Sequence, residues 1–326
     1  MFELHSDTVL PDHFRNCVVA IGNFDGVHRG HQALLAQTQE IARSLGKPWG
    51  VVTFEPHPRT FFRPEQPAFR LTPRALKLRL LKALGADFVS VVDFDAELAA
   101  LSPEEFIVHQ LEQKLGAAHV VAGFDFHFGK GRKGNLDSLR AHGFEVTRIA
   151  EVTEEGAGDL AFSSSNIRNA LRQGQISRAS QELGYDWTIL GTVVPGDQRG
   201  RTIGFPTANI IVEPGVEPER GIYATFVREI DRPEPLWMGA GYFGDRPTFN
   251  TNRTFLEVYI LDETLDLYGR QLLVSFVELI RPDQSFTSVD ALIAQMTEDC
   301  KNARAILSAH KVANFPLAKM QAAGKI

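Results

Sequence analysis

A pair of histidines in a glycine-rich turn is the first group of residues that could do chemistry. Residues 22–31 read Gly-Asn-Phe-Asp-Gly-Val-His-Arg-Gly-His, between an apolar run and a helical pattern. The first turn of a helix presents unpaired amide hydrogens and the positive end of its dipole, so anions bind there. His28 and His31, three residues apart, can share one side of that turn. Gly22 and Gly30 let the backbone approach a ligand closely. The turn therefore predicts a phosphate site.

Two other interpretations of the histidine pair stay open. A metal half-site would need further nitrogen or thiolate ligands, and none lies nearby, because Cys17 and Cys300 stand at opposite ends of the chain. The same spacing offers no disulfide framework and fits a reducing compartment. Any bound metal is therefore expected to use oxygen ligands. A structural role for one histidine is the second alternative.

A second anion-binding segment follows later in the same half of the chain. Residues 163–168 read Ser-Ser-Ser-Asn-Ile-Arg. Hydroxyls at a helix start, from Ser163 and Ser164, together with Arg168 one turn later, form a corner that suits phosphate. A helix cap alone would need only one serine.

Two aromatic segments follow predicted strands. Residues 53–59 read Thr-Phe-Glu-Pro-His-Pro-Arg, and residues 123–129 read Gly-Phe-Asp-Phe-His-Phe-Gly. Ligands of open parallel sheets bind beyond the carboxyl ends of the strands, so both segments are expected at that edge. Their rings could line a slot for a planar ligand. A phenylalanine-rich stretch is also typical of a hydrophobic core, and that alternative stays open.

Two glycine patterns are rejected as cofactor motifs. Residues 129–134, Gly-Lys-Gly-Arg-Lys-Gly, have dinucleotide-binding spacing, but their basic residues and late position argue against a Rossmann dehydrogenase. Residues 123–130 have one residue too many for a phosphate-binding loop, and Gly131 replaces the magnesium-binding hydroxyl. A solvated basic loop and a phosphate contact both remain open for residues 129–134.

The second candidate site is a loop rich in glycine and threonine. Residues 191–210 read Gly-Thr-Val-Val-Pro-Gly-Asp-Gln-Arg-Gly-Arg-Thr-Ile-Gly-Phe-Pro-Thr-Ala-Asn-Ile. Such a loop can fold its amides and charges around phosphates. Thr207 and Asn209, two apart in an extended segment, offer neutral oxygens on one side to a magnesium ion. The residues expected to bind phosphate here are Gly196, Arg199, Gly200, Arg201 and Gly204.

Glu257 is the candidate general base of this half. It lies in Leu-Glu-Val-Tyr-Ile-Leu-Asp, residues 256–262, where Val258 and Ile260 share one face and Glu257 and Tyr259 the other. A carboxylate on an inward-facing position costs free energy unless it is used. The pattern fits an outward-facing glutamate equally well.

The elements that position the first group alternate between strands and helices. This alternation from residue 16 to residue 184 predicts a parallel sheet covered by helices. The expected strands are 17–21, 49–54, 88–94, 119–122 and 144–149. The expected helices are 32–45, 73–84, 103–115, 165–172 and 176–183.

The pattern changes after Tyr185. Strand-like segments separated by Gly, Pro, Asn and Asp turns predict a small antiparallel barrel or sandwich. The expected strands are 187–194, 222–229, 236–243, 254–261 and 272–279, followed by one helix over 289–309. We therefore predict two domains, residues 1–186 and 187–326.

Composition excludes several classes of protein. The 326 residues are 44% apolar and 23% charged, which is typical of a soluble globular chain rather than a disordered one. A net charge of -6 disfavours nucleic acid as a partner. The amino terminus lacks a signal-peptide pattern, and no apolar run reaches membrane-spanning length. We expect a cytoplasmic protein with small-molecule partners, no membrane association, and a monomeric or weakly homo-oligomeric state.

These motifs together resemble the bacterial bifunctional riboflavin kinase and FMN adenylyltransferase family. The His-x-Gly-His pattern at 28–31 alone resembles the class I nucleotidyltransferases. The match extends over almost the whole chain in the same order, and Gly-Phe-Pro-Thr-Ala-Asn at 204–209 is its most specific motif. The matching segments are 22–32, 53–59, 123–134, 163–168, 191–210, 218–225, 245–249 and 256–269.

The resemblance implies two ATP-dependent reactions. The barrel would phosphorylate riboflavin to FMN, with Thr207 and Asn209 holding Mg²⁺ and Glu257 taking the hydroxyl proton. The α/β domain, a Rossmann-like nucleotidyltransferase, would then join FMN to AMP from a second ATP. His28, His31, Ser164 and Arg168 would stabilise the ATP phosphates there. The further site residues expected are Gly22, Asn23, Gly30 and Ser163 for ATP, and Phe54, Pro56, His57, Pro58, Asp125, Phe126, Phe128 and Arg246 for flavin.

Some positions depart from the family pattern, and two other functions stay open. Ser165 and Asn166 replace a common Ser-Thr and a variable residue, Tyr242 replaces a frequent asparagine, and Tyr259 replaces a common histidine. One alternative is a single-activity FMN adenylyltransferase whose barrel only binds flavin. The other is a flavin-sensing protein without turnover.

Overall fold

The computed structural model describes residues 1–5, 8–66, 68–152, 161–196, 199–232, 234–245 and 254–311. Within it the chain divides into two compact units. The first holds Met1–Ala68 and Lys77–Ser163, and the second holds Phe69–Leu76 and Ser164–Ile326. The segment 69–76 and the two helices after Ser163 therefore pack in the second unit.

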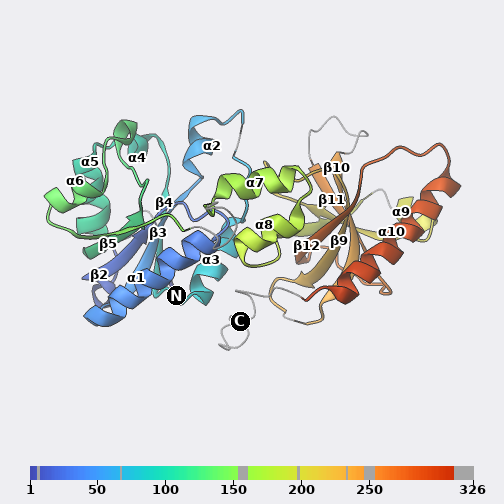
Figure 1. Cartoon of the computed structure of the whole chain (residues 1–326), viewed down its shortest axis with the longest axis horizontal. Helices are drawn as coiled ribbons and strands as arrows, with labels where there is room; N and C mark the ends of the chain where they lie inside the picture. Colours follow the sequence, from blue (N-terminus) through green and yellow to red (C-terminus); the bar gives the residue numbers. More distant parts are fainter. Residues whose placement is uncertain are drawn as a thin grey trace. The chain divides into compact units, whose positions relative to one another are not determined.

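The first unit is built on a six-stranded parallel sheet in the order β1-β4-β3-β2-β5-β6 (Figure 1). Its strands are β1 Phe2–Leu4, β2 Cys17–Ile21, β3 Trp49–Glu55, β4 Phe88–Asp93, β5 Ala117–Gly123 and β6 Glu145–Ile149. Its α-helices are α1 Arg29–Leu45, α2 Pro58–Phe62, α3 Arg74–Ala83, α4 Ala96–Ala100, α5 Pro103–Phe106 and α6 Leu136–Ala141. Helix α3 begins in the second unit, and its part from Lys77 onward belongs to the first. Short 3₁₀ turns lie at Asp12–Phe14 and Lys130–Arg132.

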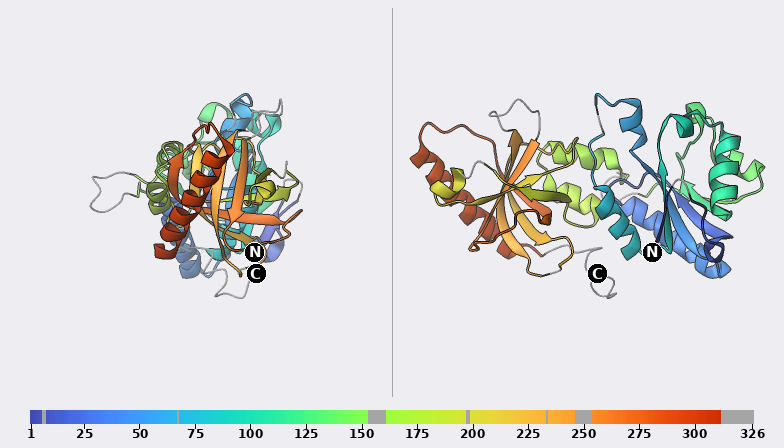
Figure 2. Two further views of the ribbon diagram at one scale, coloured as in Figure 1. Left: turned by 90° about the vertical axis from the view of Figure 1, so that its right-hand side faces the viewer. Right: turned by 180° about the vertical axis from the view of Figure 1, so that it is seen from behind.

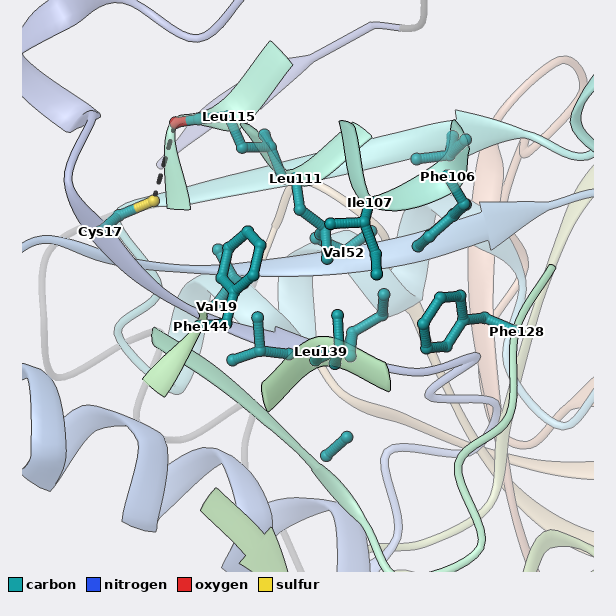
Figure 3. Packing of buried hydrophobic residues seen from close by; sticks show 14 of the residues in the cluster. Cys17, Val19, Val52, Phe106, Ile107, Leu111, Leu115, Phe128, Leu139 and Phe144 are labelled. Carbon is teal, nitrogen blue, oxygen red and sulfur yellow. Dashed lines mark hydrogen bonds between the residues drawn. The ribbon is translucent and has the colours of Figure 1, made fainter. Parts of the chain in front are cut away.

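Both faces of this sheet are covered, which explains why its central strands β2, β3 and β4 are almost continuously buried. All five residues of β2 are buried. Helix α1 packs along β2 on one side. On the other, Val19 and Val52 meet Leu111 and Leu139 from helices in the cluster that Figure 3 shows. The sequence predicts one helix over 103–115, and the structure has α5 continued by a π-helical segment, Ile107–Leu115.

The second unit is a closed antiparallel barrel in the order β10-β11-β8-β7-β12-β9. Its strands are β7 Thr188–Val194, β8 Thr207–Ile211, β9 Gly221–Glu229, β10 Trp237–Asp245, β11 Thr254–Ile260 and β12 Gln271–Pro282. The other elements are α7 Ser164–Arg172, α8 Ile176–Leu183, α9 Arg199–Thr202 and α10 Val289–Ala309. Figure 2 shows α10 along the outside of the barrel, where Ala303 and Leu307 pack against Ala224 and Phe226 of β9.

The predicted fold class is confirmed: a parallel sheet with helices is followed by a small antiparallel barrel and a terminal helix. Closure of the barrel decides between the two expected β architectures in favour of the barrel.

Candidate active sites

The loop after β2 turns sharply before α1 begins. Phe24, Gly26 and Val27 have positive φ angles of 49°, 86° and 38°. His28 is the extended residue that precedes the helix, and Arg29 is its first helical residue. The Gln32 side-chain amide donates to the Val27 carbonyl oxygen at 2.8 Å. This turn places both predicted histidines within one helical turn, as the spacing indicates.

The two imidazoles are stacked on each other. Their ring centroids lie 3.7 Å apart at an interplanar angle of 24°. The edge of Phe24 packs against His31, with centroids 5.2 Å apart. A Cβ at Gly30 would come within 3.2 Å of the His28 ring, so the missing side chain makes room for it. The structure thus brings His28, His31 and Gly30 together.

His31 has a buried ring nitrogen whose hydrogen-bonding capacity is not used by the described residues. This nitrogen is Nδ1. Burial, the neighbouring His28 and the positive charge of Lys77 hold the pKa of His31 well below its usual range. His31 is therefore neutral at pH 7 in the free protein.

Lys77 is a buried residue of this site that the sequence reasoning missed. Its ammonium lies 2.6 Å from Glu55 Oε1. It also donates to Thr53 Oγ1 at 3.2 Å and to the Asn23 carbonyl oxygen at 3.4 Å. The sequence feature that could have indicated Lys77 is its position among leucines, on a helix with one apolar face.

The predicted flavin residues of this unit divide into buried and accessible positions. Phe54 and Phe128 are buried, with 8% and 6% exposure, and belong to the hydrophobic core. Phe128 packs beside Phe106 (Figure 3). Pro56 and Asp125, after β3 and β5, are exposed. His57 caps α2 by accepting a bond from the Arg59 amide at 3.1 Å, with Pro58 as the first helical residue. Their contacts with flavin stay predictions.

Ser163, Ser164 and Arg168 lie across the division between the units. Ser163 belongs to the first unit, whereas Ser164 and Arg168, on α7, belong to the second. Within the second unit the Arg168 guanidinium donates from Nε to the Phe69 carbonyl oxygen at 2.6 Å. Their contact with ATP stays a prediction.

The second candidate site lies on the outer face of the barrel, where β8 meets β11. Asn209 is directly opposite Glu257 in the strand register. The Thr207 hydroxyl donates to Glu257 Oε2 at 3.4 Å. Leu256 and Val258 are fully buried on the other face of β11, so Glu257 faces outward, the second of the two orientations that the pattern allows. The structure brings all three predicted residues together.

The glycines of the preceding loop make room for this group. A Cβ at Gly196 would lie 2.2 Å from the Asn209 amide nitrogen, and one at Gly200 would lie 2.2 Å from the Phe205 carbonyl oxygen. Gly204 has a φ of 91°. The loop thus folds tightly over Asn209. The side chains of Arg199 and Arg201 and the whole of Arg246 lie outside the described residues.

The two tyrosines that depart from the family pattern border this group. Tyr242 is opposite Glu257 in the β10–β11 register, and its hydroxyl donates to Asp283 Oδ2 at 3.1 Å. Tyr259 is opposite Thr207 and packs against Phe205, with ring centroids 5.2 Å apart. Burial raises the pKa of Tyr259, with smaller contributions from Cys300 and Asp262.

Comparison with protein families matches both halves of the chain. FAD synthetase matches residues 10–165, and riboflavin kinase matches residues 183–307. Within the described residues, no helix combines the length and apolar character needed to cross a membrane.

Individual proteins match over most of their length. A bifunctional riboflavin kinase/FMN adenylyltransferase of Escherichia coli K12 is 41% identical over 293 residues, 88% of this chain and 92% of the relative. A protein of the same name from Pseudomonas fluorescens is 40% identical over 308 residues, 92% and 96% of the two chains. A crystal structure named as a macrolide-efflux protein from Streptococcus pneumoniae superposes with a TM-score of 0.81 at 30% identity and covers 93% of this chain and 99% of that one.

Proposed function

The chain belongs to the family of bifunctional riboflavin kinase/FMN adenylyltransferases, and from this premise we propose which residues carry its two reactions. The enzyme phosphorylates riboflavin with ATP to give FMN and ADP. It then joins FMN to the AMP part of a second ATP to give FAD and pyrophosphate. We assign the adenylyltransferase to residues 1–186 and the kinase to residues 187–326. The matched ranges, 10–165 and 183–307, support this assignment.

The kinase reaction is proposed to take place at Thr207, Asn209 and Glu257. The Glu257 carboxylate takes the proton of the ribityl 5′-hydroxyl as that oxygen attacks the γ-phosphorus of ATP. The bond from the γ-phosphorus to the bridging oxygen breaks, and ADP leaves. The observation that carries this proposal is the pairing of Glu257 opposite Asn209, with the Thr207 hydroxyl 3.4 Å from the carboxylate.

The same three residues fit a magnesium ion. Mg²⁺ prefers oxygen ligands and keeps several waters, so a hydroxyl and an amide carbonyl beside a carboxylate suit it. The absence of a Cβ at Gly196 leaves room for the Asn209 amide, and Asn209 is opposite Glu257 in the strand register. Thr207 and Asn209 would hold the ion. When bound, Mg²⁺ neutralises charge on the transferred phosphate.

Adenylyl transfer is proposed to take place at the start of α1. An FMN phosphate oxygen, ionised at neutral pH, attacks the α-phosphorus of ATP, and the bond to the β-phosphate breaks to release pyrophosphate. No strong base is needed, so the lowered pKa of His31 does not conflict with this step. His28 and His31 would donate hydrogen bonds to the phosphates as negative charge develops there.

Product analysis tests the proposed function. The purified protein is incubated with riboflavin, ATP and Mg²⁺, or with Mg²⁺ removed by a chelator, and the flavins are separated by chromatography. We expect FMN and FAD in the first sample and neither in the second. FAD from FMN but never from riboflavin would instead indicate a single-activity adenylyltransferase. Flavin binding without ATP consumption would indicate a sensor.

The proposal includes a cytoplasmic enzyme that is a monomer or a weak homo-oligomer and does not bind nucleic acid. The use of ATP in both reactions supports the location, and the net charge of -6 supports the absence of nucleic acid. Light scattering of the purified enzyme at increasing concentration measures the oligomeric state.

A further inference from the structure

Lys77 lies in an apolar environment on helix α3. It is 4% exposed, and Leu76, Leu80 and Leu81 around it in the sequence are almost completely buried. An ammonium group loses its hydration in such a place, and this loss is costly unless charged and polar partners replace the water. The residues that contact Lys77 therefore indicate what role a buried positive charge has at this position.

Those partners come from the carboxyl ends of two central strands. Glu55 and Thr53 lie at the end of β3, and Asn23 follows β2. Lys77 Nζ lies 2.6 Å from Glu55 Oε1 and donates to Thr53 Oγ1 at 3.2 Å. The Thr53 hydroxyl in turn donates to the Asn23 carbonyl oxygen at 3.0 Å. A continuous chain of hydrogen bonds thus runs from Lys77 to the residue that precedes the strained turn.

That turn needs support from its surroundings. Phe24 and Val27 are not glycines, yet both have positive φ angles. Such residues persist only where neighbouring contacts fix them. The bond from Lys77 to the Asn23 carbonyl oxygen at 3.4 Å holds the start of the turn, and the Gln32 bond to Val27 holds its end. His28 follows directly, so the direction of its ring depends on this support.

The charge of Lys77 also acts on the site. With burial and His28, it disfavours protonation of His31. Among the charged residues nearby, Glu55 is paired with Lys77 and Asp25 is buried in the turn. Arg29 is the first residue of α1. A cation near the neutral His31 imidazole supplies positive potential to a bound triphosphate while His31 remains a hydrogen-bond donor.

We propose that Lys77 is a positioning residue for adenylyl transfer, which holds the histidine turn through Thr53 and Asn23 and supplies positive potential beneath it. The proposal rests on the function assigned above to His28 and His31. It adds a residue on α3 to a site otherwise formed by the strand ends and α1. A purely structural role for the pair with Glu55 is the alternative that the experiment must separate.

Three variants separate the two roles. Lys77→Met leaves the Glu55 carboxylate, whose side chain is only 12% exposed, without its cation. Lys77→Met/Glu55→Gln removes both charges at similar volume and relieves that imbalance. Glu55→Gln alone keeps the ammonium group. For each variant, kcat and KM for FAD formation from FMN are measured, and the pKa of His31 is determined by NMR, with His31→Gln to assign its signal.

We expect kcat for FAD formation to fall at least about tenfold in the double variant. The His31 pKa should rise in the double variant toward its ordinary value, whereas Glu55→Gln keeps it at or below the wild-type value. FMN formation from riboflavin should stay unchanged in all three, because the proposed kinase residues lie in the second unit. Circular dichroism and thermal unfolding of each variant show whether the first unit, which holds Lys77, is still folded. A double variant with wild-type kcat and a wild-type His31 pKa would overturn the proposal. His31→Ala, measured in parallel, tests the underlying site: if it still makes FAD at the wild-type rate, the assignment of the histidines fails independently of Lys77.

Discussion

At the scale of single residues, both candidate sites are built from polar side chains whose positions are fixed by neighbouring residues. Asn209 and Glu257 face each other across two strands, and His28 and His31 stack at a helix start. Little conformational entropy is then lost when a ligand binds. Substitutions that remove one functional group at these positions can therefore test the role of that group.

Thr207→Val removes the hydroxyl while keeping the shape of the side chain. If this oxygen holds Mg²⁺, kcat for FMN formation should fall roughly 100-fold, and the Mg²⁺ concentration for half-maximal rate should rise. Magnesium titrations of the kinase reaction measure both. Thr192→Val, at a half-buried threonine of β7, is the matched control and should change neither. An unchanged magnesium dependence in Thr207→Val would remove this residue from the metal site.

The lowered pKa of His31 makes the stability of the protein depend on pH. Below the ordinary histidine pKa of about 6.5, the unfolded chain binds a proton that the folded His31 rejects. The free energy of unfolding should therefore fall with decreasing pH, by at most about 1.4 kcal/mol per unit from this group. His31→Gln should lose this part of the slope. Calorimetry between pH 7 and pH 5 compares the two, and equal slopes would show that His31 titrates alike in the folded and unfolded states.

At the scale of elements, the loops that follow strands position the proposed catalytic residues. Glycines in these loops leave the space that neighbouring side chains occupy. The loop before β8 folds onto Asn209 because position 196 has no Cβ. In the first unit, helix α1 begins where Gly30 leaves space for the His28 ring. In each proposed site, one glycine thus leaves space for the side chain of a site residue.

Gly196→Ala and Gly30→Ala therefore form a matched pair of variants. The new Cβ at 196 would lie 2.2 Å from the Asn209 amide and must displace it, so FMN formation should fall at least about tenfold. The new Cβ at position 30 would lie 3.2 Å from the His28 ring, which must shift slightly. FAD formation from FMN should therefore fall, by a smaller factor. Each variant is the control for the other. A loss of FAD formation in Gly196→Ala, or of FMN formation in Gly30→Ala, would contradict the placement of the sites.

Most elements could be predicted from the sequence because their patterns are local. Apolar runs such as Cys17–Ile21 are buried on both faces of a parallel sheet and can be recognised without the rest of the chain. The short β1, Phe2–Leu4, was missed because three residues carry too little pattern, and it pairs with β4 far along the chain. The packing of α7 and α8 in the second unit depends on tertiary contacts that alternation does not encode.

The candidate sites were predicted in part for the same reason. Glycines and polar residues within one motif, such as Thr207 and Asn209, can be read together. The contact between Lys77 and Glu55 joins a helix to a strand 22 positions away in the sequence, and periodicity only makes Lys77 look misplaced. The outward face of Glu257 became clear only with the closed barrel.

At the scale of the whole molecule, the two groups of proposed residues lie in separate compact units with different architectures. His28 and His31 belong to the first unit, and Thr207, Asn209 and Glu257 belong to the second. The proposed sites thus place the two ATP-dependent reactions on two different frameworks. The central claim is that each framework holds its own site.

Following both reactions in two single variants tests this claim most directly. Wild type, His31→Ala and Glu257→Gln are each supplied with ATP, Mg²⁺ and either riboflavin or FMN, and the flavin products are quantified by chromatography. We predict that His31→Ala accumulates FMN from riboflavin without making FAD, and that Glu257→Gln makes FAD from FMN but no FMN from riboflavin. Loss of both reactions in either variant, with the fold intact by circular dichroism, would contradict the account.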